Sequence, residues 1–173
     1  MSTPPRTLRT SLVTGIRLDP VLAATLLAEL LDPSEELWLV SAWVSDVAAV
    51  DNTRGDYDSL FADASARTYP LSEILALLTR SGTHLTVVTR PAEHNETFLG
   101  RLRHRAEPQR WTLVQHADVH EKTLCGRNWL LTGSMNFTLR GMQVNDEAVT
   151  YTFGEAAAAQ ARIDFARRWG NPP

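Results

Sequence analysis

Strand-length apolar runs alternate with segments of helical periodicity along most of this 173-residue chain. The densest run, 37–44, is apolar almost throughout. Such a run is typical of a strand that is covered on both faces. Further strands are expected at 84–89, 111–116, 120–125, 128–133 and 147–153, and helices from Asp19 onward and at 72–80, 93–106 and 155–169. The alternation predicts an α/β fold with a layered sheet.

Local signals mark two helix boundaries and suggest one domain. Asp19 and Pro20 are expected to open the first helix as its cap and first-turn residue. Gly82 is expected to end the helix at 72–80. A chain of this length is predicted to form a single domain over residues 1–173, with residues 1–6 flexible.

Composition restricts the class of protein. With 43% hydrophobic and 21% charged residues, the chain resembles an ordinary soluble protein. It shows no signal-peptide pattern at its start and no run near the roughly 20 apolar residues of a membrane helix, so no membrane contact is expected. Its single cysteine, Cys125, excludes an internal disulfide and fits a reducing cytoplasm. The net charge of -3 argues against indiscriminate nucleic-acid binding.

Residues 46–69 do not fit a short connection, because they show little apolar periodicity. A loop of this length in a compact domain is uncommon and often functional. One interpretation is a lid or specificity loop over a sheet edge, with Arg54 contacting a substrate phosphate. A disordered surface insertion is an equally good interpretation.

The chain contains a single lysine. All but one of its 17 lysine and arginine residues are arginine, and the exception, Lys122, follows His120 by two positions. A lysine in so arginine-rich a chain suggests chemistry that uses a compact ammonium rather than a planar guanidinium. One stray lysine would mean little by itself, but Ser134, Asn136 and Glu147 follow in Gly-Ser-Met-Asn and Asn-Asp-Glu runs.

The spacing of these residues places polar groups on common faces. Positions i and i+2 of a strand point to the same side, so His120 and Lys122 are expected to share one face, and Ser134 and Asn136 another. Gly133 would let a ligand oxygen approach the backbone. Imidazole, ammonium, hydroxyl and amide groups all form hydrogen bonds with phosphate oxygens, which predicts a phosphate site.

The H-x-K pair, the downstream G-S-x-N-F-T run and the later glutamate resemble the signature of the phospholipase D superfamily. The resemblance implies a phospholipase-D-like layered sandwich, with a mixed central sheet and helices on both faces. It also implies a histidine that attacks phosphorus, a lysine and an asparagine that hold phosphate oxygens, a serine that contacts the phosphate and a glutamate that orients the histidine. These catalytic roles map onto His120, Lys122, Asn136, Ser134 and Glu147.

The chain departs from the superfamily pattern at one position. Arg127 stands where the pattern has an aspartate, five residues after Lys122, and the stretch to Gly133 is one residue short. The resemblance implies a structural role for that aspartate, so the change bears on the local turn more than on the chemistry. Residues 126–128 are expected to form a tight turn between two strands.

Arg90 and His94 are further candidates for substrate binding. They follow the strand at 84–89, and α/β proteins tend to bind ligands at the carboxyl ends of strands. No spacing of histidine and cysteine resembles a zinc site. The chemistry expected here requires neither a metal nor another cofactor.

One H-x-K motif implies two chains. The superfamily reaction uses one histidine to attack phosphorus and another to protonate the leaving oxygen. The chain has no second lysine and hence no second H-x-K. A homodimer with His120 and its symmetry mate at one composite site is therefore expected.

These features predict a metal-independent phosphodiesterase, most simply a cytoplasmic DNA nuclease. A weaker resemblance to phospholipase-D-like proteins of bacterial defence clusters, such as those tied to deazapurine DNA modification, suggests phage defence and partner proteins of a defence complex. One alternative is a nucleic-acid-binding module with weak or no hydrolysis, which Arg127 and the acidic net charge favour. A phospholipid hydrolase is disfavoured because the sequence shows no basic amphipathic membrane face.

Overall fold

A computed structural model describes residues 4–11, 13, 15–61 and 66–170. Its centre is a seven-stranded sheet in the order β1-β9-β8-β7-β2-β5-β6. Strands β2, β5 and β6 are parallel, whereas β2–β7, β7–β8, β8–β9 and β9–β1 are antiparallel pairs. The seven strands are β1 (Arg6–Thr10), β2 (Glu36–Ser41), β5 (His84–Thr89), β6 (Trp111–Gln115), β7 (Lys122–Cys125), β8 (Trp129–Gly133) and β9 (Glu147–Phe153).

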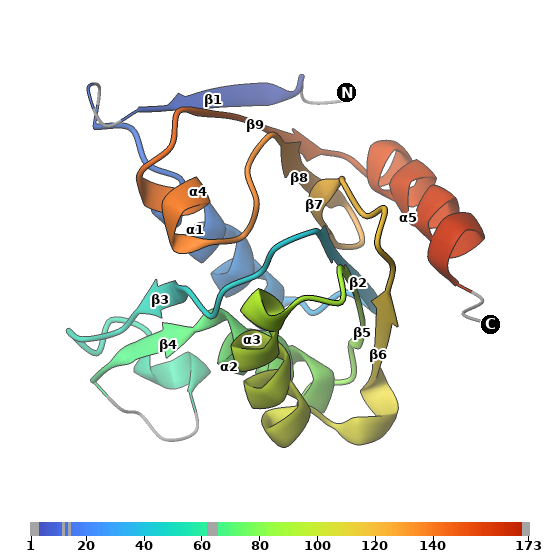
Figure 1. Ribbon diagram of the computed structural model, residues 1–173. Coiled ribbons are helices and arrows are strands. Elements are labelled where there is room, and N and C mark those ends of the chain that lie inside the picture. Colours follow the sequence, from blue (N-terminus) through green and yellow to red (C-terminus); the bar gives the residue numbers. More distant parts are fainter. Residues whose placement is uncertain (1–3, 12, 14, 62–65, 171–173) are drawn as a thin grey trace.

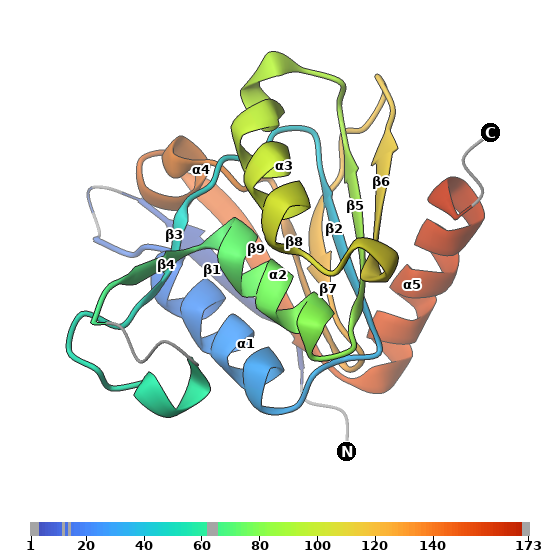
Figure 2. The same cartoon turned by 90° about the horizontal axis from the view of Figure 1, so that it is seen from below.

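Helices lie on both faces of this sheet. Three of them, α1 (Asp19–Leu31), α2 (Leu71–Arg80) and α3 (Glu93–Arg105), cover one face, and α5 (Glu155–Trp169) covers the other (Figures 1 and 2). A short helix, α4 (Leu139–Gln143), follows β8. The predicted α/β sandwich with a mixed central sheet is confirmed.

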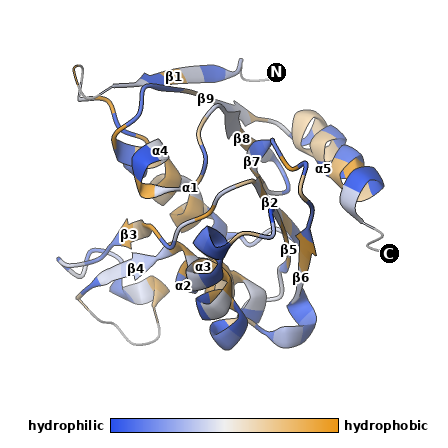
Figure 3. Cartoon of the chain, in the orientation of Figure 1, coloured by the Kyte–Doolittle hydropathy of each residue, from blue (hydrophilic) through white to orange (hydrophobic). Residues whose placement is uncertain are grey.

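The core has two layers because β2 buries side chains on both of its faces. Leu37 and Leu39 belong to the large cluster beneath α1, α2 and α3. Trp38 and Val40 point the other way, into a smaller cluster with residues of α5. Each fully buried aliphatic side chain contributes roughly 1.5–3 kcal/mol. In Figure 3 the central strands are largely in hydrophobic colours, while α5 alternates between hydrophobic and hydrophilic residues.

Some of the predicted helix and strand ends agree with the structure, and others differ from it. Gly82 has a φ of +106° and follows the end of α2, as predicted. Asp19 is not a cap: it is the first residue of α1, and its carboxylate pairs with Arg17. Strand β2 ends at Ser41 rather than at residue 44, because the next carbonyl, that of Ala42, accepts hydrogen bonds from the side chains of α3 and β5.

Strand β1 was not predicted, and it begins at Arg6, inside the segment expected to be flexible. Residues 1–3 lie outside the described part of the chain. The strand is an edge strand whose side chains are mostly exposed, so it shows no apolar pattern. Its ladder with β9 holds it in place, with Leu8 opposite Val149 and Thr7 bonded to Thr150 through their hydroxyls.

The segment 46–69 is largely ordered rather than a single irregular loop. It contains a small two-stranded sheet of β3 (Ala48–Asp51) and β4 (Thr68–Pro70), with a 3₁₀ turn, η1 (Asp58–Leu60), between them. Phe61 stacks on Tyr69 with ring centroids 3.8 Å apart, and both rings are buried. The hairpin packs against α1 and α2. Residues 62–65 lie outside the described part of the chain.

Cys125 offers a direct test of the layer under α5. The thiol is fully buried, and this burial raises its pKa to about 11. At pH 8 the folded protein should therefore react with 5,5′-dithiobis(2-nitrobenzoate) far more slowly than the protein unfolded in guanidinium, because the thiolate is the reactive species. Absorbance of the released thionitrobenzoate measures both rates. Rapid stoichiometric reaction of the folded protein would contradict this packing.

Candidate active site

One end of the central sheet gathers the predicted catalytic residues. Strand β7 runs antiparallel to β2, so Lys122 at its start pairs with Ser41 at the end of β2. Strand β8 ends at Gly133, and β9 begins at Glu147. These strand ends lie at the same end of the sheet, because Lys122 is opposite Ser41 and Gly133 is opposite Val149. The hydrogen-bond register thus brings together residues that are far apart in the sequence.

His120 and Lys122 are adjacent, although not as neighbours in one strand. Strand β7 begins only at Lys122, so His120 lies in the segment before it. The Nζ of Lys122 is nevertheless 3.2 Å from Nδ1 of His120, and it also donates to the His120 carbonyl. The imidazole is exposed and the lysine half-buried. The expectation of a His–Lys pair on one side therefore holds, but by a different local geometry.

This contact determines which proton the histidine carries. If the protonated Lys122 donates to Nδ1, the neutral imidazole of His120 has its proton on Nε2. A ring in that tautomer is a hydrogen-bond donor at Nε2 and has no lone pair there for nucleophilic attack. For Nε2 to attack a substrate, Nδ1 must take the proton and Lys122 must turn to another acceptor.

Glu147 has partners other than His120. Its carboxylate accepts hydrogen bonds from the Ser134 hydroxyl and, over 3.3 Å, from the Asn145 amide. The Ser134 hydroxyl in turn accepts from the backbone amide of Ala148 at 3.1 Å. Among the described residues, the predicted Glu147–His120 hydrogen bond is not formed. Ser134 links the end of β8 to the start of β9 and holds the carboxylate in place.

The electrostatic environment of Lys122 shows that Arg90 and Glu147 both act on it. Partial burial, together with the positive charge of Arg90, lowers the pKa of the Lys122 ammonium, while the negative charge of Glu147 opposes this effect. Burial and a like charge both disfavour the protonated form of lysine. A bound phosphate would supply the negative charge that Lys122 and Arg90 together attract.

Asn136 lies next to a cavity of about 320 Å³ at the same end of the sheet. Its side-chain oxygen accepts a 3.4 Å hydrogen bond from the buried hydroxyl of Ser41, the last residue of β2. The carbonyl of Phe137, the next residue, accepts from the Ser45 amide at 2.8 Å. The cavity is lined by residues of the loop after β2, the first turn of α3, the loop after β8 and the region of α4: Trp43, Ser45, His94, Asn136, Thr138, Leu139, Arg140 and Asn145.

The structure brings two of the three predicted substrate-binding residues to this site. The Arg90 Nε donates to the Val119 carbonyl at 2.9 Å, directly before His120. His94 lines the cavity, and its Nε2 lies 2.9 Å from the Ser45 hydroxyl. Arg54 is elsewhere, in the turn after β3. Hydrogen bonds from the side chain and backbone of Thr53 lower the pKa of the nearby Asp51 carboxyl, and the charge of Arg54 adds a smaller effect in the same direction.

Gly133 has a role different from the predicted one. A Cβ atom at this position would collide with the backbone carbonyl of Ala148 in β9. The glycine therefore permits close approach of two strands, and a ligand oxygen finds no space against its backbone on that side. The expectation of a ligand contact at Gly133 is wrong for this reason.

Arg127, at the position of the expected aspartate, stabilises the turn between β7 and β8. Its side chain pairs with Asp32 at the end of α1, and its backbone amide donates to Ser34 at 2.8 Å. Arg162 of α5 donates to the carbonyls of Gly126 and Arg127 at 2.6 and 2.7 Å. The predicted tight turn at 126–128 is present, and these contacts anchor it to both layers.

Sequence reasoning missed several residues of the cavity, among them Trp43, Arg140 and Asn145. The strand predicted at 37–44 includes Trp43 near its end, whereas the chain leaves the sheet after Ser41. Arg140 lies on α4, a helix of five residues that is too short to show a periodic pattern. Asn145 stands beside Glu147 in a polar run, which was the one available signal.

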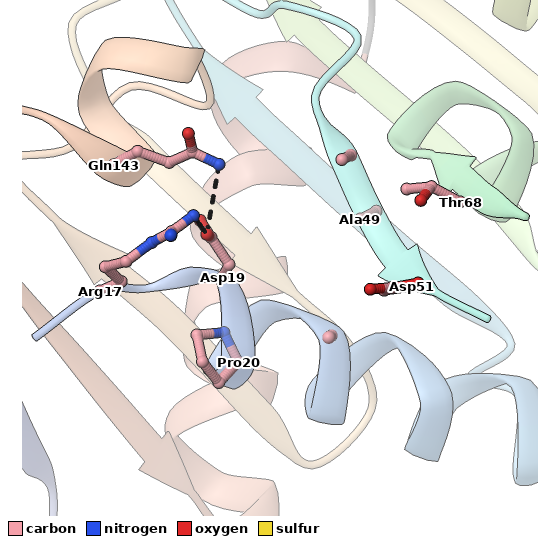
Figure 4. Close-up of a pocket in the computed structure, with 9 residues that line it drawn as sticks. Arg17, Asp19, Pro20, Ala49, Asp51, Thr68 and Gln143 are labelled. Atoms are coloured by element: carbon pink, nitrogen blue, oxygen red, sulfur yellow. Dashed lines mark hydrogen bonds and ion pairs between the residues drawn. The ribbon is translucent and has the colours of Figure 1, made fainter. Parts of the chain in front are cut away.

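A second hollow, of about 440 Å³, lies between α1, the β3–β4 hairpin and the end of α4 (Figure 4). Its polar groups largely satisfy one another: Arg17 pairs with Asp19, and Gln143 donates to the same carboxylate at 3.2 Å. It contains none of the predicted catalytic residues. We therefore place the chemistry at the end of the sheet that carries His120 and Lys122, where Asn136 lines the smaller cavity.

The described residues contain neither a metal-binding cluster nor a membrane-spanning helix. No group of three or more histidine, cysteine, aspartate or glutamate side chains among them is arranged to hold a metal ion. Within the same ranges, no helix has both the length and the apolar character needed to cross a bilayer.

The family model described as "Cardiolipin synthase, PLD-like domain" matches residues 57–169. This match covers more than half of the chain, which therefore belongs to the phospholipase D superfamily. The expected superfamily is thus confirmed. No curated protein is similar to the chain in sequence.

Solved structures share the fold at low sequence identity. Nuc from Salmonella typhimurium, a phospholipase D family member, is 12% identical with a TM-score of 0.60, and the match covers 97% of this chain and 95% of Nuc. NucT from Helicobacter pylori is 9% identical with a TM-score of 0.61 and 95% coverage of both chains. Polyphosphate kinase from Porphyromonas gingivalis is 15% identical with a TM-score of 0.65, covering 98% of this chain and 26% of the kinase.

The contact between Lys122 and His120 predicts a strong effect of Lys122→Arg on hydrolysis. The guanidinium keeps the charge but replaces a point donor with a broad planar fork, which cannot occupy the 3.2 Å position beside Nδ1 in the same way. We expect kcat to fall roughly 100-fold, the size of effect caused by removing one transition-state donor. Turnover of bis(p-nitrophenyl) phosphate measures the change, and circular dichroism checks the fold. Near-normal turnover would contradict the role of the ammonium.

Proposed function

We propose that the protein is a metal-independent phosphodiesterase that cleaves DNA. The observation that carries this proposal is the His120–Lys122 contact at the sheet end that also holds Asn136, Ser134 and Glu147. Membership in the phospholipase D superfamily and the fold shared with Nuc and NucT support a phosphodiesterase. The net charge of -3 is compatible with DNA cleavage because three cationic side chains, Lys122, Arg90 and Arg140, lie at this end of the sheet.

The proposed reaction has two displacement steps at phosphorus. In the first, Nε2 of His120 attacks the phosphorus atom, the bond to the leaving oxygen breaks, and a second histidine donates a proton to that oxygen. In the second, the same second histidine takes a proton from water, whose oxygen attacks phosphorus and releases His120. Lys122 and the Asn136 amide hold the non-bridging oxygens through both steps.

The contacts of Lys122 suggest how substrate prepares the nucleophile. In the free protein the ammonium donates to Nδ1 of His120. A phosphodiester brings a full negative charge, which is a stronger acceptor for an ammonium than a neutral ring nitrogen. The Lys122 ammonium then turns to the phosphate, and the imidazole proton of His120 moves from Nε2 to Nδ1. The lone pair of Nε2 is then free to attack phosphorus. Glu147 is the carboxylate that would accept a hydrogen bond from the Nδ1–H group of His120. It becomes available for this bond once the Ser134 hydroxyl no longer donates to it.

The biological setting follows from the same proposal. We place the protein in the cytoplasm, where its buried thiol stays reduced, and in phage defence beside partner proteins of a defence complex, as the weaker family resemblance suggests. Survival of a phage challenge by cells that express the wild-type chain or His120→Ala would test this part alone. Equal survival of both strains would remove defence from the proposal and leave the nuclease activity standing.

A DNA-binding module without hydrolysis is the second candidate. The observation that favours it is the engagement of Glu147 by Ser134 and Asn145 rather than by His120. Tight DNA binding by the wild-type protein, with no product over hours of incubation, would support this alternative. Release of headgroups from phosphatidylglycerol vesicles, with no action on DNA, would instead support a lipid substrate.

Chelation separates this mechanism from metal-dependent cleavage. Because His120 supplies the nucleophile and Lys122 the positive charge, DNA cleavage should continue at its full rate in excess EDTA. Gel analysis of labelled oligonucleotides measures it, and His120→Ala is the control for a contaminating nuclease. Cleavage that EDTA abolishes and magnesium restores would point to a different mechanism.

The need for two histidines predicts a homodimer. One chain supplies one H-x-K pair, and its imidazole is exposed at the surface, where a second copy has access to it. A two-fold axis near His120 would place both imidazoles at one phosphate. Each would then serve once as nucleophile and once as acid, and one composite site would form per dimer.

Subunit mixing tests this composite site. Excess His120→Ala chains should reduce activity far below the wild-type fraction, because most wild-type chains then sit in heterodimers with one imidazole. Exchange is confirmed by native mass spectrometry with a tagged subunit, and Arg103→Gln chains serve as the mixing control. Activity proportional to the wild-type fraction would mean that one chain suffices, and His94 would then be the candidate for the second acid.

A further inference from the structure

The cavity beside Asn136 is the right size and chemistry for part of a substrate beyond the scissile phosphate. Its volume is about 320 Å³, and it lies between the loop after β2, the first turn of α3 and the start of α4. Asn136, proposed to hold the phosphate, lies on its wall. The next group along a bound strand would therefore enter this cavity.

Trp43 presents a fixed aromatic surface to this cavity. Its side chain is 37% exposed, and it is the largest ring on the cavity wall. His94 meets it edge to face, with ring centroids 5.9 Å apart at an interplanar angle of 85°, and the Arg90 guanidinium carbon lies 5.8 Å from the ring centroid. The backbone is also fixed, because the Trp43 carbonyl accepts from the buried Ser41 hydroxyl at 2.9 Å. The ring is thus held in place while part of its surface stays open.

Arg140, which also lines the cavity, supplies a positive charge without a carboxylate partner among the described residues. Arginines elsewhere pair with carboxylates, as Arg101 does with Asp46 and Arg105 with Glu73. The Arg140 guanidinium forms no such bond with any described residue, and the side chain is exposed. Its backbone is anchored, since its carbonyl accepts from the amides of Val144 and Asn145 at 2.9 and 2.8 Å. An arginine placed in this way suits a phosphate group.

We propose that this cavity is a nucleotide subsite for single-stranded DNA, in which the base next to the scissile phosphate stacks on Trp43 and the neighbouring phosphate contacts Arg140. The inference rests on the proposed nuclease function and names its substrate class. An aromatic platform combined with a cationic contact is how single strands are bound without reading their sequence. A base within a duplex is already stacked between its neighbours, and unstacking it costs a few kcal/mol. The protein should therefore prefer single strands or frayed ends to intact duplex.

Binding is measured first, on the His120→Ala background, so that cleavage does not interfere. A fluorescein-labelled single strand and the same strand in a blunt duplex serve as probes in fluorescence anisotropy. Trp43→Leu should weaken single-strand binding about tenfold or more, the effect of losing one stacked base. Trp43→Phe should retain most of the affinity, and its behaviour separates loss of stacking from loss of folding. Phe153→Ala, an exposed aromatic at the far end of β9, is the matched control.

Salt dependence tests the arginine. Arg140→Gln should lower the slope of log Kd against log salt by about 0.7, the value for one phosphate contact on a single strand. Arg103 is an exposed arginine near the carboxyl-terminal end of α3, away from His94. The Arg103→Gln variant should leave the slope unchanged. Equal slopes for the two variants would overturn the phosphate contact.

Cleavage assays then distinguish an error in the proposed subsite from an error in the proposed nuclease function. With an active His120, the loss of kcat/KM caused by Trp43→Leu should be about tenfold greater on the single strand than on an abasic strand of the same length, which keeps the phosphates and has no base to stack. Hydrolysis of both substrates with no such difference, or equal affinity for duplex and single strand, would overturn the subsite and leave the nuclease proposal intact. Single-strand binding that requires Trp43, without hydrolysis of either substrate, would support the subsite and overturn the nuclease proposal.

Discussion

The ladder between β2 and β7 is the constraint on which the rest of the structure depends. Strand β2 joins a parallel half of the sheet, β5 and β6, to an antiparallel half, β7, β8, β9 and β1. Its side chains fill the cores on both sides, so it cannot shift without exposing one set or the other. The register Ser41↔Lys122 then sets the position of the lysine. Side-chain packing in the middle of the sheet thus determines where Lys122 lies at the end of the strands.

Sequence patterns predicted the central strands and the long helices because burial leaves a strong periodic signal. The bounds of β5, β9 and α5 agree with those expected from apolar runs alone. Elements held mainly by hydrogen bonds left no such signal: β1 is an exposed edge strand, and α4 has five residues. The hairpin within 46–69 was missed because its buried residues, including Phe61 and Tyr69, are widely spaced.

The candidate site was predictable in composition and less so in contacts. The H-x-K spacing placed the imidazole and the ammonium together, and the strand ends placed Arg90 and His94 nearby. The partner of Glu147 was not predictable, because Ser134 and His120 are both reasonable hydrogen-bond donors and only the backbone geometry decides between them. Arg54 failed as a phosphate contact because the hairpin that carries it packs beside α1 and α2.

The turn at Arg127 shows why the departure from the family pattern leaves the site assembled. Two separate layers hold it, Asp32 and Ser34 from the α1 side and Arg162 from α5. These contacts lie at the end of β7 opposite to Lys122. Lys122 and Glu147 are positioned by strand register, whereas Trp43 and Arg140 lie on a loop and a short helix. Substitutions at Trp43 or Arg140 can therefore change the cavity wall without disturbing the strand register that positions Lys122 and Glu147.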